Sequence, residues 1–243
     1  MKILEYKLLL ISIAPALSIG IAVYMSDRYE KEPISMLIKT LLLGALMVIP
    51  TLIVENMLLT FNIFPGILGI AYISFVVAGF TEEYFKRSVV LRYIYRNKNF
   101  NERLDGIVYS VFSALGFSVV ENIMYIVFRF NDNAYVGLYR GILSVPAHAV
   151  FAVTMGYYIS LAKFCKDCNN EKDRKKYLKK SLYIPVILHG IFDFILMSGL
   201  PMLNIIFIPY LIYLWKSNQK KLDSYIIDSR NDNINHIDVN EVD

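Results

Sequence analysis

The sequence predicts an all-α, polytopic membrane protein in which about seven transmembrane helices form one bundle with an intramembrane polar cavity. Hydrophobic residues make up 56% of the 243 residues and charged residues only 19%, whereas soluble domains average about 45–50% and about 25%. The charges are unevenly placed, because residues 34–79 carry only Lys39 and Glu55, and residues 181–215 carry only Asp193. Long apolar runs with so few charges are typical of bilayer-spanning helices. We expect no strands, because backbone polar groups in lipid are satisfied within helices.

Seven segments are apolar and long enough to be candidate spans. They are residues 3–24, 34–59, 66–85, 106–128, 141–162, 181–198 and 201–215. We interpret the first as a retained helix rather than a signal peptide, because Glu5 lies in its first turn and no small-residue cleavage site follows. The chain is therefore expected to consist of a transmembrane domain over residues 1–215 and a polar, disordered cytoplasmic tail over residues 216–243.

Basic residues in the short loops predict the orientation of the bundle. Residues 86–105 carry six Lys and Arg and residues 163–180 carry eight, whereas residues 129–140 carry two and residues 62–65 none. Loops enriched in Lys and Arg stay in the cytoplasm. We therefore expect the N-terminus outside and the C-terminus inside. The net charge of +4 is too small to indicate a nucleic-acid partner.

Two cysteines, Cys165 and Cys168, form a C-x-x-C pair at the cytoplasmic end of the fifth span. A structural zinc site needs four ligands, and neither a second pair nor a nearby histidine accompanies them. A thioredoxin-like context is also missing. We assign these thiols no role.

Several ionisable residues fall at membrane depth, where each costs about 2.5–3.5 kcal/mol on insertion scales. They are Glu55, Glu82, Glu83, Glu121, His148, His189 and Asp193, with Asn122 beside Glu121. Glu55 lies near the outer end of its span and is interpreted as an interfacial charge. The others point to a functional cluster.

Local spacing suggests how some of these residues interact. Glu82 and Lys86 are four residues apart on one helix face, which allows an ion pair. The neighbouring Glu83 points about 100° away, so the two glutamates cannot have the same role. Asp193 follows His189 by four residues and can orient its imidazole.

Carboxylates and imidazoles on separate spans suit hydrolysis within a membrane. A glutamate can activate water as a general base while histidines stabilise the oxyanion or protonate the leaving amine. Alternatively, two histidines and a glutamate form the ligand set of a catalytic zinc. Ser/His/Asp catalysis is less attractive, because neither Ser118 nor Ser144 lies in a nucleophile-elbow context.

Five short motifs in order carry a family resemblance. They are E-E-x-x-K at Glu82–Lys86, D-G at Asp105–Gly106, G-F-x-x-x-E-N at Gly116–Asn122, a mid-helix histidine at His148 and H-x-x-F-D at His189–Asp193. In order and spacing they resemble the PrsW family of membrane-embedded proteases, relatives of the type II CAAX prenyl proteases. The CAAX pattern has histidine where this chain has Glu121, and more often has Asn at the position of Asp193.

The resemblance implies a protease of the bacterial cell membrane that makes the first (site-1) cut in a single-pass, membrane-anchored anti-sigma factor during a stress response. It implies a transmembrane protease domain over residues 1–215. Its catalytic residues would be Glu82 as general base, Glu83 as its companion, and His148 and His189. The supporting polar cluster would be Lys86, Glu121, Asn122 and Asp193. The relatives suggest a mechanism without a cofactor, and zinc held by Glu82, His148 and His189 remains open.

Two other classes of function use the same kinds of residue. A transporter or ion pathway also places carboxylates and histidines in its spans, often within paired repeats, and the chain has no evident repeat. A membrane scaffold could retain protease-like residues for packing alone.

Overall fold

The computed structural model confirms the all-α architecture. It describes residues 2–125, 134–164 and 171–240, and none of these residues forms a strand. Cys165 and Cys168 lie outside the described residues. In chain order the elements are α1 (Lys2–Ser26), α2 (Ile34–Leu46), α3 (Val48–Leu59), α4 (Gly66–Tyr72), the π-helix η1 (Ile73–Phe80), α5 (Thr81–Val89), the π-helix η2 (Val90–Ile94), α6 (Arg103–Ile123), α7 (Ala134–Lys163), α8 (Glu171–Ser198) and α9 (Pro201–Asn240).

Five helices in the described part of the chain are long and apolar enough to cross a membrane. They cover Ile34–Leu59, Gly66–Ile94, Arg103–Ile123, Leu143–Lys163 and Glu171–Ser198, and a shorter apolar helix covers Ile13–Ser26. The span that begins at Gly66 continues to Ile94 rather than ending near residue 85. The extension places Glu82 and Glu83 near the middle of this helix.

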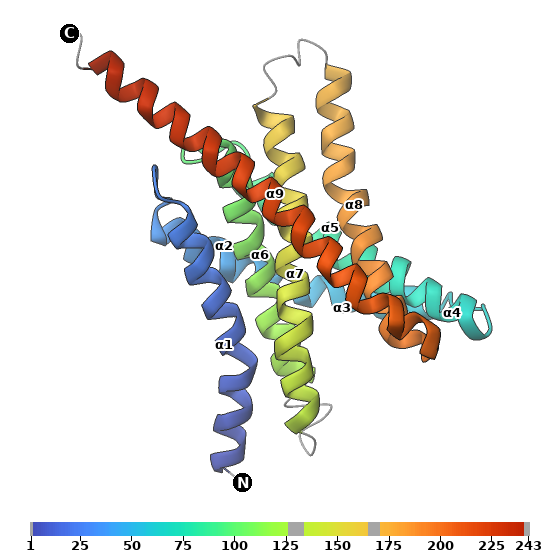
Figure 1. The fold of residues 1–243 in the computed structure, drawn as a ribbon. Helices are drawn as coiled ribbons and strands as arrows, with labels where there is room; N and C mark the ends of the chain where they lie inside the picture. The colour runs from blue at the N-terminus through green and yellow to red at the C-terminus, as the bar shows by residue number, and fades with distance from the viewer. Residues whose placement is uncertain (1, 126–133, 165–170, 241–243) are drawn as a thin grey trace.

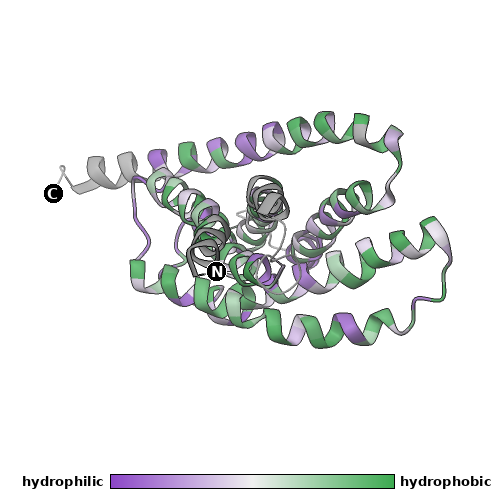
Figure 2. Ribbon diagram, turned by 90° about the horizontal axis from the view of Figure 1, so that it is seen from below, coloured by the Kyte–Doolittle hydropathy of each residue, from purple (hydrophilic) through white to green (hydrophobic). Residues whose placement is uncertain are grey.

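Helices α2 and α3 present an apolar stripe to the outside of the bundle. Ile38, Leu42, Leu46, Ile49 and Ile53 recur every three or four residues, and more than half of each side chain is exposed. Figure 2 shows hydrophobic residues, in green, recurring along most of the helices. Such a stripe fits contact with lipid, since large exposed apolar patches are rare on soluble monomers.

Helix α6 lies at the centre of the bundle, between α2 and α7. A Cβ atom added at Gly156 of α7 would lie 2.1 Å from the carbonyl oxygen of Gly106, and one added at Gly116 would lie 1.9 Å from that of Leu41 in α2. Only glycine allows these helices to approach so closely, as in other membrane bundles. The two contacts therefore set the position of α6 relative to its neighbours.

Helices α4, η1, α5 and η2 form one continuous stretch in which two π-helical segments flank α5. Segments with π-helical hydrogen bonding often mark functional sites. Helix α8 packs closely against η1, because a Cβ atom at Gly190 would lie 2.2 Å from Cδ1 of Phe75. This contact brings His189, the residue before Gly190, next to α5.

The segment expected to form a disordered tail belongs to α9, which is helical over Pro201–Asn240. Figure 1 shows this helix crossing the bundle obliquely. The Tyr225 ring stacks on that of Tyr157 with centroids 4.9 Å apart, and its hydroxyl donates to the Tyr157 carbonyl at 2.9 Å. Arg103 of α6 pairs with Asp228 at 3.0 Å. Tertiary contacts therefore stabilise a segment whose composition alone suggests disorder.

Buried polar contacts hold the linker between α1 and α2. Oδ2 of Asp27 accepts from the Glu32 backbone N–H at 3.0 Å, and the Tyr109 hydroxyl donates to the Glu32 carboxyl. Burial, reinforced by the charges of Asp27 and Glu30, outweighs the hydrogen bond from Tyr109 and raises the pKa of Glu32 to about 7. The linker is thereby tied to α6.

The D-G motif has a structural role in this fold. Oδ2 of Asp105 accepts from the backbone N–H groups of Asn101 and Glu102 at 2.8 and 2.7 Å, which closes a capping box at the start of α6. A Cβ atom added at Gly106 would lie 2.8 Å from the carbonyl oxygen of Gly156, so this glycine also allows the close approach of α7. Both residues therefore position α6.

Candidate functional site

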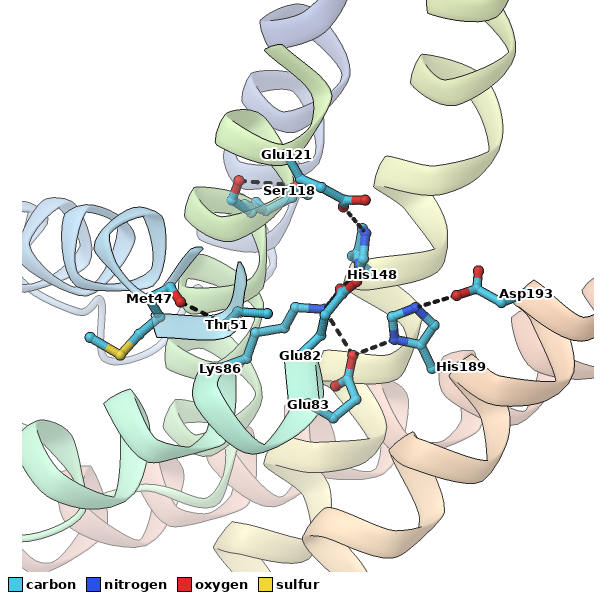
Figure 3. Close-up of polar contacts among 11 residues, drawn as sticks. Met47, Thr51, Glu82, Glu83, Lys86, Ser118, Glu121, His148, His189 and Asp193 are labelled. Atoms are coloured by element: carbon cyan, nitrogen blue, oxygen red, sulfur yellow. Dashed lines mark hydrogen bonds and ion pairs between the residues drawn. The ribbon is translucent and has the colours of Figure 1, made fainter. Parts of the chain in front are cut away.

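Ionisable residues from four helices meet in one buried cluster (Figure 3). We call it the polar cluster, and its members are Glu82, Glu83 and Lys86 of α5, Glu121 of α6, His148 of α7, and His189 and Asp193 of α8. These are seven of the eight residues that the sequence singles out. The eighth, Asn122, is buried on α6 beside Glu121.

Lys86 is the hub of the polar cluster. Its Nζ donates to Oε2 of Glu82 at 3.0 Å, to Oε1 of Glu83 at 2.9 Å and to Nδ1 of His148 at 2.9 Å. The lysine is fully buried, and its ammonium lies 4.5 Å from the centroid of the Phe117 ring. A buried charge is tolerated only when it is paired and hydrogen-bonded. Lys86 therefore compensates two carboxylates that would be costly in the bilayer.

His148 is held at both ring nitrogens. Its Nδ1 faces Lys86, and its Nε2 lies 2.9 Å from Oε2 of Glu121. Because an ammonium can only donate, Nδ1 must accept, and the N–H on Nε2 then donates to Glu121. The tautomer follows from these two partners. Glu121 thus orients a histidine on a different helix.

His189 is also held on both sides. Its Nδ1 lies 2.9 Å from Oε1 of Glu83, and its Nε2 lies 3.3 Å from Oδ2 of Asp193. The Phe151 ring stacks on the imidazole with centroids 5.1 Å apart and an interplanar angle of 20°. Asp193 can therefore orient the imidazole of His189, as the spacing of four residues predicts.

The two adjacent glutamates have different surroundings. Glu83 is 1% exposed, and its Oε1 accepts from both Lys86 and His189, whereas its Oε2 has no hydrogen-bond partner among the described residues. Glu82 is 6% exposed, and its Oε2 accepts from Lys86. Glu83 therefore braces α5 against α8, and Glu82 is the more accessible carboxylate.

Glu55 of α3 lies closer to the polar cluster than its place in the sequence suggests. It is partly buried, and it interacts electrostatically with Glu82, Glu121, Lys86 and His189. Sequence reasoning assigns it to the outer interface because it lies near the end of its span. Pro50 could have indicated this position in the sequence, because helices commonly kink near proline. In the structure the helix is interrupted close to it, at Met47 between α2 and α3. A break there changes the direction of the second half of the span.

Three members of the polar cluster could hold a metal ion. Glu82, His148 and His189 are buried, and each offers a ligand atom within 4.8 Å of the other two. We call them the donor group. Two histidines and a carboxylate fit a catalytic zinc that keeps its fourth position for water. However, all four imidazole nitrogens face other side chains, so a metal would have to displace existing contacts.

Comparison with known proteins relates this arrangement to a protease family. The family model described as "PrsW family intramembrane metalloprotease" matches residues 32–215, a range that contains the whole polar cluster. The chain is 43% identical to "Protease PrsW" of Clostridioides difficile (strain 630) over 93% of this chain and 94% of that protein. It is 34% identical to "Protease PrsW" of Bacillus subtilis (strain 168) over 84% of this chain and 88% of that protein. No solved structure matches the chain.

Proposed function

We propose that this chain, which belongs to the PrsW family of intramembrane metalloproteases, makes the first (site-1) cut in a single-pass, membrane-anchored anti-sigma factor. Membership of the family makes the chain a membrane-embedded protease. The identity of the substrate is the finer part of the proposal. It rests on the resemblance of the motifs, and the location of the polar cluster on membrane-spanning helices supports it.

In the proposed reaction, Glu82 is the general base that takes a proton from the attacking water. The observation that carries this assignment is the contrast between the two glutamates, because Glu83 is bonded to both Lys86 and His189 whereas Glu82 is more accessible. A positioned general base contributes about 10²–10⁴-fold to the rate.

The remaining members of the polar cluster position the reacting groups. His148 and His189 are held by Glu121 and Asp193 respectively, so their rings are oriented before substrate binds. Preorganised groups stabilise developing charge without reorganising during the reaction. We assign the two imidazoles to the oxyanion and to the leaving amine.

Metal dependence is a separate part of the proposal. The donor group fits zinc in residue type and in spacing. When bound there, zinc would polarise the peptide carbonyl and make the attacking water more acidic. The contacts of Glu121 with His148 and of Asp193 with His189 orient the two imidazoles in either case.

For the location of the protein, we propose the bacterial cell membrane, with the C-terminus in the cytoplasm. The basic loops at residues 86–105 and 163–180 support this orientation. In this orientation both loops lie in the cytoplasm. An accessibility assay on cysteines introduced into each loop would show directly on which side of the membrane the loop lies.

The cleavage assay uses the full-length protein, reconstituted in liposomes with a single-pass anti-sigma factor. We expect Glu82→Gln and His189→Ala to reduce cleavage by at least about 100-fold, and the surface control Glu171→Gln to cleave like the unsubstituted protein. Unchanged cleavage by Glu82→Gln and His189→Ala would refute the assignment. The same liposomes test the transporter alternative, because ion flux that these two substitutions abolish without any cleavage would support transport.

A further inference from the structure

The ammonium of Lys86 lies among the atoms that a metal ion would need. It is 3.0 Å from Oε2 of Glu82 and 2.9 Å from Nδ1 of His148, so it bonds to two of the three residues of the donor group. The third residue, His189, faces Oε1 of Glu83, which is the atom that Lys86 also contacts. Lys86 thus contacts the donor group directly or through one shared atom (Figure 3).

Two cations cannot share this position. Zinc needs ligand atoms at about 2.0–2.2 Å, and the imidazole lone pair that would bind zinc at Nδ1 of His148 already accepts a proton of Lys86. His148 cannot offer Nε2 instead without releasing Glu121. Repulsion between an ammonium and a divalent ion is also strong where water is excluded. Metal binding therefore requires the ammonium to leave His148 and Glu82.

Glu83 can retain the displaced lysine. It does not belong to the donor group, and its Oε2 is a buried acceptor without a hydrogen-bond partner among the described residues. A buried acceptor without a partner is unusual and costly. A small movement of Nζ from Glu82 toward Oε2 of Glu83 would satisfy that atom and vacate the donor group. The lysine would remain paired in both arrangements.

We propose that Lys86 is the built-in cation of this site, which stabilises the donor group without metal and competes with zinc for it. Two consequences follow. The protein folds without zinc, because the lysine already compensates the carboxylates. Zinc affinity is weaker than the ligand set alone would provide, because each binding event must displace the ammonium. The inference rests on the proposed function for the role of the donor group, but neither consequence involves substrate.

The first experiment measures zinc affinity in detergent at one fixed pH, by competition with a chromophoric chelator. The variants are Lys86→Met, which removes the charge and keeps a side chain of similar length, and Lys39→Met, which makes the same change on the exposed face of α2. We expect Lys86→Met to bind zinc at least about tenfold more tightly than the unsubstituted protein. Lys39→Met should leave the affinity unchanged. Lys86→Met/His148→Ala should lose the gain.

A second measurement does not depend on whether Lys86→Met folds. The unsubstituted protein is treated with a strong chelator, and its thermal unfolding midpoint is compared with and without added zinc. We expect the chelated protein to retain its midpoint within about 2 °C, whereas a structural zinc site would lose considerably more. A large loss on chelation would overturn the proposal, as would folded Lys86→Met with unchanged or weaker zinc affinity. Either result would leave the cleavage assay informative, because neither measurement uses substrate.

Discussion

Nδ1 of His148 lies 2.9 Å from Nζ of Lys86, and this contact joins the histidine of α7 to the glutamates of α5. The two residues are 62 positions apart in the sequence. The pair makes the protonation pattern of His148 depend on a lysine from another helix, and it leaves the N–H on Nε2 for Glu121. The tautomer of His148, a residue of α7, therefore depends on side chains of α5 and α6.

Asp193 is expected to be a positioning residue for His189. Asp193→Ala removes the carboxylate 3.3 Å from Nε2, so the imidazole loses the partner that orients it. Carboxylates that support an active-site histidine are worth about 10–100-fold in activity. We expect kcat for cleavage to fall by that factor, with KM and the thermal midpoint little changed.

Two variants control for this effect. Asp193→Glu should restore part of kcat, because the longer carboxylate can still reach the imidazole. Glu171→Gln, on the exposed first turn of the same helix, should leave kcat unchanged. A marked rise in KM or a clear fall in the thermal midpoint of Asp193→Ala would indicate a merely structural role.

Gly156 is expected to be essential to the crossing of α6 and α7. Gly156→Ala adds a Cβ atom 2.1 Å from the Gly106 carbonyl oxygen, so the helices must separate. Overpacking of this kind costs about 1–3 kcal/mol, which thermal unfolding in detergent would detect.

Gly20→Ala is the matched control for this substitution. Its added Cβ atom would meet Cδ1 of Leu115 at an ordinary 3.5 Å, and alanine forms helix more readily than glycine. We expect it to be neutral or slightly stabilising. Equal destabilisation by the two alanines would contradict the close contact of α6 and α7.

Stability is expected to depend on pH through Glu32. The pKa of this linker residue is raised to about 7 from a usual value near 4.5, so the folded protein holds the proton more tightly than the unfolded chain. The stabilisation is fully present below about pH 4.5 and is lost as the pH rises through about 7. Thermal midpoints measured from pH 5 to pH 8 should therefore decrease.

Glu32→Gln tests the origin of this slope. The amide keeps an oxygen that can accept from Tyr109 but cannot ionise, so the variant should show a flatter pH profile and a higher midpoint at pH 8. Asp223→Asn, an exposed change on α9, should retain the original slope. An unchanged slope in Glu32→Gln would rule out this carboxyl as its source.

Tyr225 is expected to hold the second half of α9 on the bundle. Tyr225→Ala removes both the stacking on Tyr157 and the hydrogen bond to its carbonyl, and truncating a buried aromatic side chain costs about 3 kcal/mol or more. We expect faster hydrogen–deuterium exchange over residues 222–231. Ile227→Ala, which truncates an exposed side chain of the same helix, should leave exchange unchanged, and similar exchange in both variants would argue against docking through Tyr225.

Local contacts in the polar cluster were predictable from spacing. The ion pair of Glu82 and Lys86 and the contact of Asp193 with His189 each join residues four apart on one helix, and helix geometry alone brings such residues together. The different surroundings of Glu82 and Glu83 follow from the same geometry. The motifs also indicated the residues of the cluster, because ionisable groups in the bilayer are costly without a role.

The sequence by itself determined that this chain is an all-α membrane protein and which ionisable residues lie in its spans, since those properties depend on composition and on spacing along single helices. The order of its motifs also carried the resemblance to the PrsW family. Only the tertiary structure decided that Lys86 bonds to His148, that Glu121 holds His148, that Glu55 lies close to the cluster, and that α9 docks through Tyr225. These contacts depend on the rotation and depth of each helix. Rotation and depth are set by where helices approach closely, as at Gly106 and Gly156, and such contacts join residues far apart in the chain.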